Sequence, residues 1–376
     1  MTELSPRGVS FDARQMEMGT SSQEAEAQSL SSIIIAEPHG YCGGVRPAVA
    51  RTTEIVYIAN LFGENVYTFN PIIHNRRLNE KWAAMGLVTL TDRDPNGDWV
   101  YDQVPNGSLV TISAHGAKPQ DYERLAEKDC TVFDTTCVLV DNEHEDVERA
   151  LESGHEVILF GRSGHAESRG TLGYGSQGKI NFVTGEEDMR ALEIDPEKTY
   201  ELFRQTTLST KEMRAVNEIA RGRIPNVFFD EKRLGCYATD HRQLAVQRLI
   251  DEHLADAVLV VGDGELSNNT KSLAGVGPEN GVPSWIVNDP GDIDWDWFRG
   301  IKNLGVSSSA SALETTLESV IREFETRGID VRHQIPVVKE NMSASFPLKR
   351  AELAPFETRY GITITPEFLS LIPKVA

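Results

Sequence analysis

The chain has 376 residues, which is enough for two or three domains of ordinary size. Apolar residues make up 40% and charged residues 25%, a balance typical of packed globular proteins rather than disordered ones. The formal net charge of −20, from 37 basic and 57 acidic side chains, disfavours binding to nucleic acid or to an anionic membrane surface.

Residues 1–31 are rich in Ser, Gln and Glu and lack the apolar stretch of a signal peptide. No apolar run approaches the roughly 20 residues that cross a bilayer. We therefore expect residues 1–31 to form a flexible arm and the protein to be cytoplasmic. In that compartment the four cysteines are expected to be ligands, nucleophiles or core residues rather than disulfide partners.

Short apolar runs bounded by Gly, Pro, Asn or Asp alternate with amphipathic stretches, which predicts parallel α/β sheets. The clearest helix is expected last, where apolar residues from Leu313 to Phe324 recur at helical spacing. Ser311 and Glu314 form the capping-box pattern that would open this helix. The strands are expected, in chain order, at residues 32–36, 65–69, 109–113, 131–133, 157–160, 181–184, 201–204, 226–229, 257–261, 284–287 and 303–306.

Three cysteines, Cys42, Cys137 and Cys236, recur at nearly equal intervals. Each stands in a loop beside a predicted strand and has Gly or Thr as a neighbour. This spacing indicates three similar α/β lobes that would each bring one thiol to a shared centre. The fourth, Cys130, breaks the spacing, and we expect it to be a small core residue.

Three such thiols can be unrelated buried residues or metal ligands. The close C-x2-C pairs typical of zinc sites are absent. Iron–sulfur clusters are usually held by four thiolates, which can lie far apart in sequence. Three ligands would leave one iron open to bind a substrate oxygen.

Three histidines, His74, His115 and His165, each follow a predicted strand. Ligands of open α/β sheets bind at the carboxyl ends of strands. A single histidine there is usually an ordinary loop residue, but three in equivalent settings favour an anion site, since imidazoles donate hydrogen bonds to phosphate oxygens.

Further hydrogen-bond donors are expected where residues 205–209, 267–270 and 311–314 open helices with hydroxyl and amide side chains. No Walker-type loop is present, so these would form a different kind of polyanion pocket. Glu167 stands two residues after His165. Inside such a pocket it would act as a general acid if burial keeps it protonated.

Together these segments resemble the 4-hydroxy-3-methylbut-2-enyl diphosphate (HMBPP) reductase family of the non-mevalonate isoprenoid pathway. The matching pieces occur in family order from about residue 33 to residue 346. They are GYCGGV at 40–45, IHNR at 73–76, SAHG at 113–116, FDTTC at 133–137, GHAE at 164–167, QTTLS at 205–209, CYAT with RQ at 236–243, SNN at 267–269 and ASA at 310–312.

The resemblance implies a trefoil of three similar α/β lobes with small parallel sheets around a central [4Fe–4S] cluster. We expect an N-terminal arm at 1–31, lobes at 32–136, 137–234 and 235–332, and a C-terminal tail at 333–376. The residues implied are Cys42, Cys137 and Cys236 for the cluster; His74, His115, His165, Ser267, Asn268, Asn269 and Ser311 for the diphosphate; and Glu167 and Thr206 for proton delivery, with Glu167 as the acid.

The reaction implied by the resemblance is the reductive dehydroxylation of HMBPP to isopentenyl and dimethylallyl diphosphates at the open iron of the cluster. Ferredoxin or flavodoxin would supply the electrons.

Some positions depart from the usual family pattern. Asn, Arg, Pro, Thr and Asn are usual where this chain has Glu37, His39, Val138, Asp240 and His241. These departures leave open a specialised paralogue with the same cluster and another substrate. A non-enzymatic iron–sulfur sensor of diphosphates and a hydrolase with a cysteine nucleophile are further alternatives.

Overall fold

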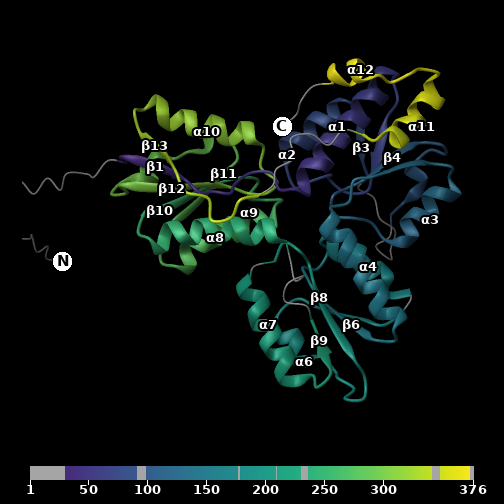
Figure 1. Cartoon of the computed structure of the whole chain (residues 1–376), viewed down its shortest axis with the longest axis horizontal. Coiled ribbons are helices and arrows are strands. Elements are labelled where there is room, and N and C mark those ends of the chain that lie inside the picture. The colour runs from purple at the N-terminus through teal and green to yellow at the C-terminus, as the bar shows by residue number, and fades with distance from the viewer. Residues whose placement is uncertain are drawn as a thin grey trace, which may run out of the picture.

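The computed structural model describes residues 30–90, 99–176, 178–208, 210–229, 236–340 and 348–372. Within them the chain forms three parallel sheets with their own helices, which Figure 1 shows as three lobes. The expected α/β class, with small parallel sheets arranged as a trefoil, is confirmed. The predicted arm at 1–31 lies outside the described residues, apart from residues 30 and 31.

The first sheet has the strand order β3-β2-β4-β5. The buried indole of Trp82 donates to Thr53 Oγ1 at 3.1 Å, which fastens α2 to α1. The elements of this lobe are α1 (Val45–Leu61), β2 (Val66–Thr68), α2 (Arg76–Ala84), β3 (Leu87–Thr89), η1 (Tyr101–Gln103), β4 (Leu109–Ile112), α3 (Pro119–Glu127) and β5 (Thr131–Asp134).

The second sheet has the order β7-β6-β8-β9. Its β6 is buried along its whole length, with Ile158 in one apolar cluster and Val157 in another, as expected for a parallel strand covered on both faces. The elements are α4 (Val138–Glu152), β6 (Glu156–Phe160), α5 (Ala166–Leu172), η2 (Gly173–Ser176), β7 (Ile180–Val183), α6 (Glu186–Ala191), β8 (Tyr200–Arg204), α7 (Thr210–Arg223) and β9 (Val227–Phe228).

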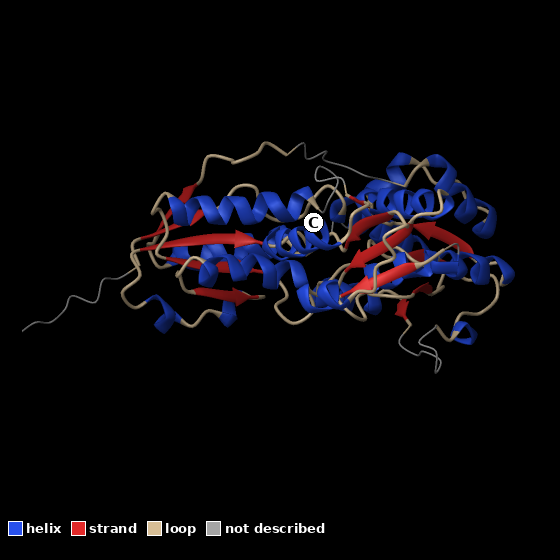
Figure 2. Ribbon diagram, turned by 90° about the horizontal axis from the view of Figure 1, so that it is seen from below, coloured by secondary structure: helices blue, strands red, loops and turns tan. Residues whose placement is uncertain are grey.

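The third sheet has the order β11-β10-β12-β1-β13. Helices cover both of its faces, as Figure 2 shows. The elements are β1 (Ser32–Ile35), α8 (Tyr237–Asp251), β10 (Ala257–Val261), α9 (Asn268–Glu279), β11 (Ser284–Val287), η3 (Pro290–Asp292), η4 (Trp295–Phe298), β12 (Asn303–Ser308), α10 (Glu314–Thr326) and β13 (Asp330–His333).

The sequence-based boundaries place β1 in the first lobe, but the structure places it in the third sheet, paired in parallel with β12 and β13. The reason is its composition. Ile33 and Ile35 enter the apolar cluster on one face of the sheet, and Ile34 enters the cluster on the other. Such a strand needs a sheet that is covered on both faces, whatever its distance along the chain.

The C-terminal tail contains two further helices, α11 (Arg350–Tyr360) and α12 (Pro366–Ser370), so the helix at 314–326 is not the last. They lie beside α1 in Figure 1. Phe356 and Ile364 join the buried cluster that contains Ile55 of α1. The tail therefore completes the core of the first lobe.

All the expected strands are confirmed within two residues at each end. The short β3 and the polar β13 were not predicted, because neither carries a long apolar run. No helix among the described residues is both long enough and apolar enough to cross a membrane.

Candidate active site

The three spaced cysteines come together from the three lobes, each at the start of a helix. Cys42 precedes α1, while Cys137 and Cys236 are the N-cap residues of α4 and α8. A Cβ atom added to Gly44 would lie 2.3 Å from the Cys137 sulfur and 3.9 Å from the Cys42 sulfur. These two sulfurs are therefore near neighbours, and the Cys236 thiol shares a hydrogen bond with Cys42.

Electrostatics prevents the three thiols from ionising together without a cation. The hydrogen bond with Cys236 lowers the pKa of Cys42 to about 6, while burial raises the pKa of Cys137 to about 12. The same hydrogen bond and burial raise the pKa of Cys236. Three thiolates at helix N-termini with a shared centre form a donor set that suits iron.

The three histidines also meet. The ring centroid of His74 lies 4.3 Å from that of His115 and 5.2 Å from that of His165. One nitrogen from each ring lies within 4.8 Å of the other two. His74 and His115 follow β2 and β4, and His165 caps α5 after β6, so the expected position beyond strand ends is confirmed.

Burial holds these imidazoles neutral, with the pKa of His74 lowered to about 4 and that of His165 to about 3. His165 Nδ1 accepts from the Glu167 backbone N–H at 3.3 Å, so its proton is on Nε2. That Nε2 is buried and has no hydrogen-bond partner within the described part of the chain. An unsatisfied N–H donor of this kind suits an anionic ligand.

The polar residues of the third lobe form one network. Ser267 caps α9, as the sequence predicts, and its Oγ lies 3.2 Å from that of Ser311. Asn269 donates to Thr239 Oγ1 and accepts from the Ala310 N–H, both at 2.8 Å. Asn268, in contrast, is only partly buried and opens α9.

The capping role predicted for Ser311 is wrong. Helix α10 begins at Glu314 with Leu313 as its N-cap residue. Ser311 instead lies in the loop after β12, where its carbonyl accepts from the Asn75 side chain at 2.9 Å. The capping-box pattern was misleading because the serine forms tertiary hydrogen bonds rather than a local one.

The predicted acid, Glu167, is 2% exposed, and burial raises its pKa to about 7. The backbone N–H of Thr206 donates to Glu167 Oε1. The Thr206 carbonyl in turn accepts from the Cys236 N–H at 3.0 Å, and the Cys137 N–H donates to Ala114, beside His115, at 3.0 Å. Backbone contacts thus join the thiols, the imidazoles and the carboxyl.

A family model described as LytB protein matches residues 33–325. The chain belongs to the LytB family. It is 32% identical over 325 residues to the 4-hydroxy-3-methylbut-2-enyl diphosphate reductase of Acidothermus cellulolyticus, covering 86% of this chain and 91% of that protein.

The chain is also similar to a second relative of the same name and to two solved structures. The Pseudomonas aeruginosa protein of the same name is 32% identical over 319 residues, covering 84% of this chain and 97% of the relative. The solved E-1-hydroxy-2-methyl-but-2-enyl-4-diphosphate reductase from Plasmodium falciparum has the same fold, with a TM-score of 0.78 at 24% identity over 88% of this chain and 99% of that one. A solved (E)-4-hydroxy-3-methyl-but-2-enyl diphosphate reductase, named as the terminal enzyme of the non-mevalonate pathway, aligns with a TM-score of 0.56 at 29% identity, covering 79% and 100% of the two chains.

The residues that depart from the usual family pattern lie at a helix start or form ion pairs. Val138 is the first residue of α4, a position where proline is also common. The helix begins here with valine in place of the proline that is usual in the family. Asp240 lies 3.9 Å from Arg204 in an ion pair. Glu37 lies 3.4 Å from His39, and His241 lies 3.0 Å from Glu340. Cys130 is partly buried at the edge of an apolar cluster rather than fully in the core.

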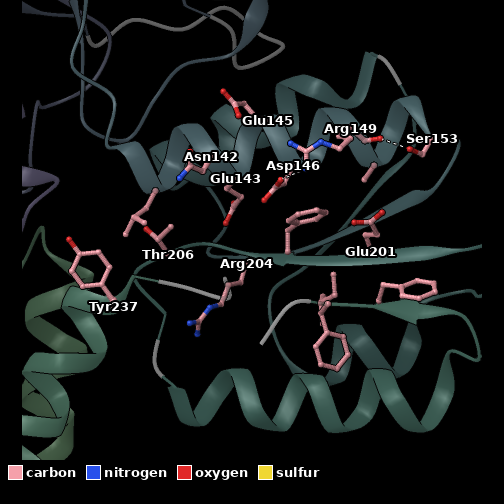
Figure 3. A pocket seen from close by; sticks show the side chains of 16 residues that line it. Asn142, Glu143, Glu145, Asp146, Arg149, Ser153, Glu201, Arg204, Thr206 and Tyr237 are labelled. Carbon is pink, nitrogen blue, oxygen red and sulfur yellow. Dashed lines mark hydrogen bonds and ion pairs between the residues drawn. The ribbon is translucent and has the colours of Figure 1, made fainter. Parts of the chain in front are cut away.

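Sequence reasoning missed a cavity of about 600 Å³ between α4 and the β8 and β9 strands of this LytB chain. In Figure 3, Glu143 and Arg204 extend into it, and Thr206 and Tyr237 stand at one end. Burial and the nearby Glu167 hold the pKa of Glu143 well above its usual range. No sequence motif distinguishes Glu143 from the other acidic residues of α4.

Proposed function

We propose that this chain catalyses the reductive dehydroxylation of HMBPP to isopentenyl and dimethylallyl diphosphates. The observation that carries the proposal is the convergence of three thiols, three neutral imidazoles and one buried carboxyl in a LytB-family chain. Relatives that are named for this activity align with this chain over 91% and 97% of their own length.

Cys42, Cys137 and Cys236 would hold a [4Fe–4S] cluster. Their sulfurs share a centre beside a glycine that leaves room for no side chain, and thiolates are the usual ligands of such clusters. When bound, the cluster would supply electrons to the substrate one at a time, from ferredoxin or flavodoxin as the donor.

The chain's own residues would hold the substrate and move protons. The three imidazoles and the donors Ser267, Asn268, Asn269 and Ser311 would bind the diphosphate, which anchors the reacting carbon. In the overall reaction the allylic C–O bond breaks, two electrons and two protons are taken up, and water leaves. Glu167 would give one proton to the departing oxygen, and Thr206 would keep its carboxyl in place.

Replacing His165 with glutamine is expected to weaken pyrophosphate binding by about tenfold or more, because a hydrogen bond to a charged ligand contributes about 1.5–3 kcal/mol. Isothermal titration of the protein with pyrophosphate at pH 7 measures this. Glu212→Gln is the matched control. Glu212, on α7, forms an ion pair with Arg162, which lies in the loop that carries His165, but Glu212 is not one of the groups around the imidazoles. An unchanged affinity in His165→Gln would remove this histidine from the anion site.

The reaction itself is tested with protein reconstituted with iron and sulfide without oxygen, then given reduced methyl viologen and HMBPP. We expect isopentenyl and dimethylallyl diphosphates as products. An intact cluster with no turnover would instead favour the paralogue with another substrate. A colourless protein that cannot be loaded with iron would contradict the proposal altogether.

A further inference from the structure

Arg242 of α8 is 0% exposed and joins two of the cysteine loops. Its Nε donates to the Gly40 carbonyl at 2.9 Å and its Nη2 to the His39 carbonyl at 3.2 Å, both in the loop that precedes Cys42. Its Nη1 donates to the Ala238 carbonyl at 2.8 Å, two residues after Cys236. One rigid guanidinium therefore fixes the Cys42 loop against the start of the Cys236 helix.

The counter-charge for Arg242 comes from Glu340, in the C-terminal tail beyond the residues that the family model matches. Glu340 Oε1 lies 3.1 Å from Arg242 Nη1, and Oε2 lies 3.3 Å from Nη2. The Glu340 side chain is only 6% exposed. A buried guanidinium that loses its carboxylate becomes an uncompensated charge, so this pair is expected to act as a unit.

The segment at 333–340 approaches both cysteine loops elsewhere as well, and in Figure 1 it runs from β13 along α8. The Glu37 N–H donates to Gln334 Oε1 at 3.1 Å, and the Val337 N–H donates to the Glu37 carbonyl at 3.1 Å. His241 Nδ1 lies 3.0 Å from Glu340. Two of the positions that depart from the family pattern, Glu37 and His241, are therefore contacts of this segment.

We propose that Glu340 is a positioning residue that, through Arg242, fixes the separation of Cys42 and Cys236 and sets the positive charge beside the Cys42 sulfur. The inference rests on the proposed function, in which these sulfurs hold the cluster. The charge of Arg242 lies close to that sulfur, because its guanidinium donates to the Gly40 carbonyl, two residues before Cys42. Glu340 offsets part of this charge, so its removal affects both geometry and electrostatics.

The variants Glu340→Ala and Glu340→Gln separate these two effects. Alanine removes the side-chain acceptor of Arg242 at Glu340, and loss of a group that orients metal ligands typically weakens metal binding by about 10–100-fold. We therefore expect Glu340→Ala to lose iron to a chelator about tenfold faster or more. Glutamine keeps an acceptor but removes the charge, so Glu340→Gln is expected to keep the cluster and shift its midpoint potential in the positive direction.

The matched control is Glu64→Gln. It removes another carboxylate that pairs with the tail, at Arg359, and that does not touch the cysteine loops. We expect this variant to equal the wild type in iron retention and in potential. If the Glu340 variants behave like Glu64→Gln in both measurements, or lower only the melting temperature, the positioning role is refuted.

A measurement on iron-free protein keeps this test independent of the proposed function. Cys42 and Cys236 lie within hydrogen-bonding reach, so mild oxidation with diamide is expected to join them readily in the wild type and in Glu64→Gln. Glu340→Ala is expected to form this bond several-fold more slowly. Equal rates would contradict the positioning role, whereas a wild type that cross-links normally but never binds iron would contradict only the proposed function.

Discussion

Replacing Glu167 with glutamine is expected to lower kcat for HMBPP by about 10²–10⁴-fold, the usual contribution of a positioned general acid. The amide oxygen can still accept the Thr206 N–H, so the local structure is retained while the transferable proton is lost. Turnover with reduced methyl viologen under anaerobic conditions measures the loss. Pyrophosphate affinity should stay close to that of the wild type, because His165 and its neighbours remain in place.

The pH profile gives this prediction a signature that a purely structural role would not have. Burial raises the pKa of Glu167 to about 7, so the carboxyl is protonated below this pH and ionised above it. Only the protonated form can donate. The wild-type kcat is therefore expected to fall above pH 7, and this decline should be absent from Glu167→Gln. Wild-type turnover in Glu167→Gln, or an unaltered alkaline limb, would remove Glu167 from the acid role.

Much of the fold could be predicted because its strands are apolar runs between turn residues. The run at 257–261 is buried along its whole length, and its predicted bounds are those of β10. What the local pattern does not encode is which sheet a strand joins. β1 joins β12 across about 270 residues, where its two apolar faces enter the apolar clusters on the two sides of the third sheet.

In the candidate site, too, local motifs could be predicted from the sequence and long-range contacts could not. Cysteines and histidines at strand ends are rare enough to stand out. The carboxyl ends of parallel strands share one edge of a sheet, which brings together His74 and His115 after β2 and β4, whereas His165 and the three cysteines come from separate lobes. The pairing of Arg242 with Glu340 could not be found this way. Arg242 lies in a matching segment that does not reveal its partner, Glu340 resembles an ordinary surface charge, and the two meet across 98 residues of sequence. Long-range pairs between charged residues leave no periodic signal in a single chain.

The glycine pair after Cys42 offers the sharpest test of the three-thiol centre. Gly44 has φ −88° and ψ −41°, a conformation that any residue adopts, so alanine costs the backbone nothing there. Its Cβ would nevertheless lie 2.3 Å from the Cys137 sulfur, which would have to move. We expect Gly44→Ala to fold normally but to retain iron about 10–100-fold less well.

Gly43→Ala is the matched control for this prediction, since it adds the same methyl group one residue earlier. Among the described residues its Cβ would meet only the Tyr237 hydroxyl, at 2.9 Å, at the far end of a side chain that is 43% exposed. We expect this variant to keep its iron, as measured by metal content and by the visible absorbance of the reconstituted protein. Full iron content in Gly44→Ala would mean that Cys137 does not need its present position, and the shared thiol centre would then lose its main geometric support.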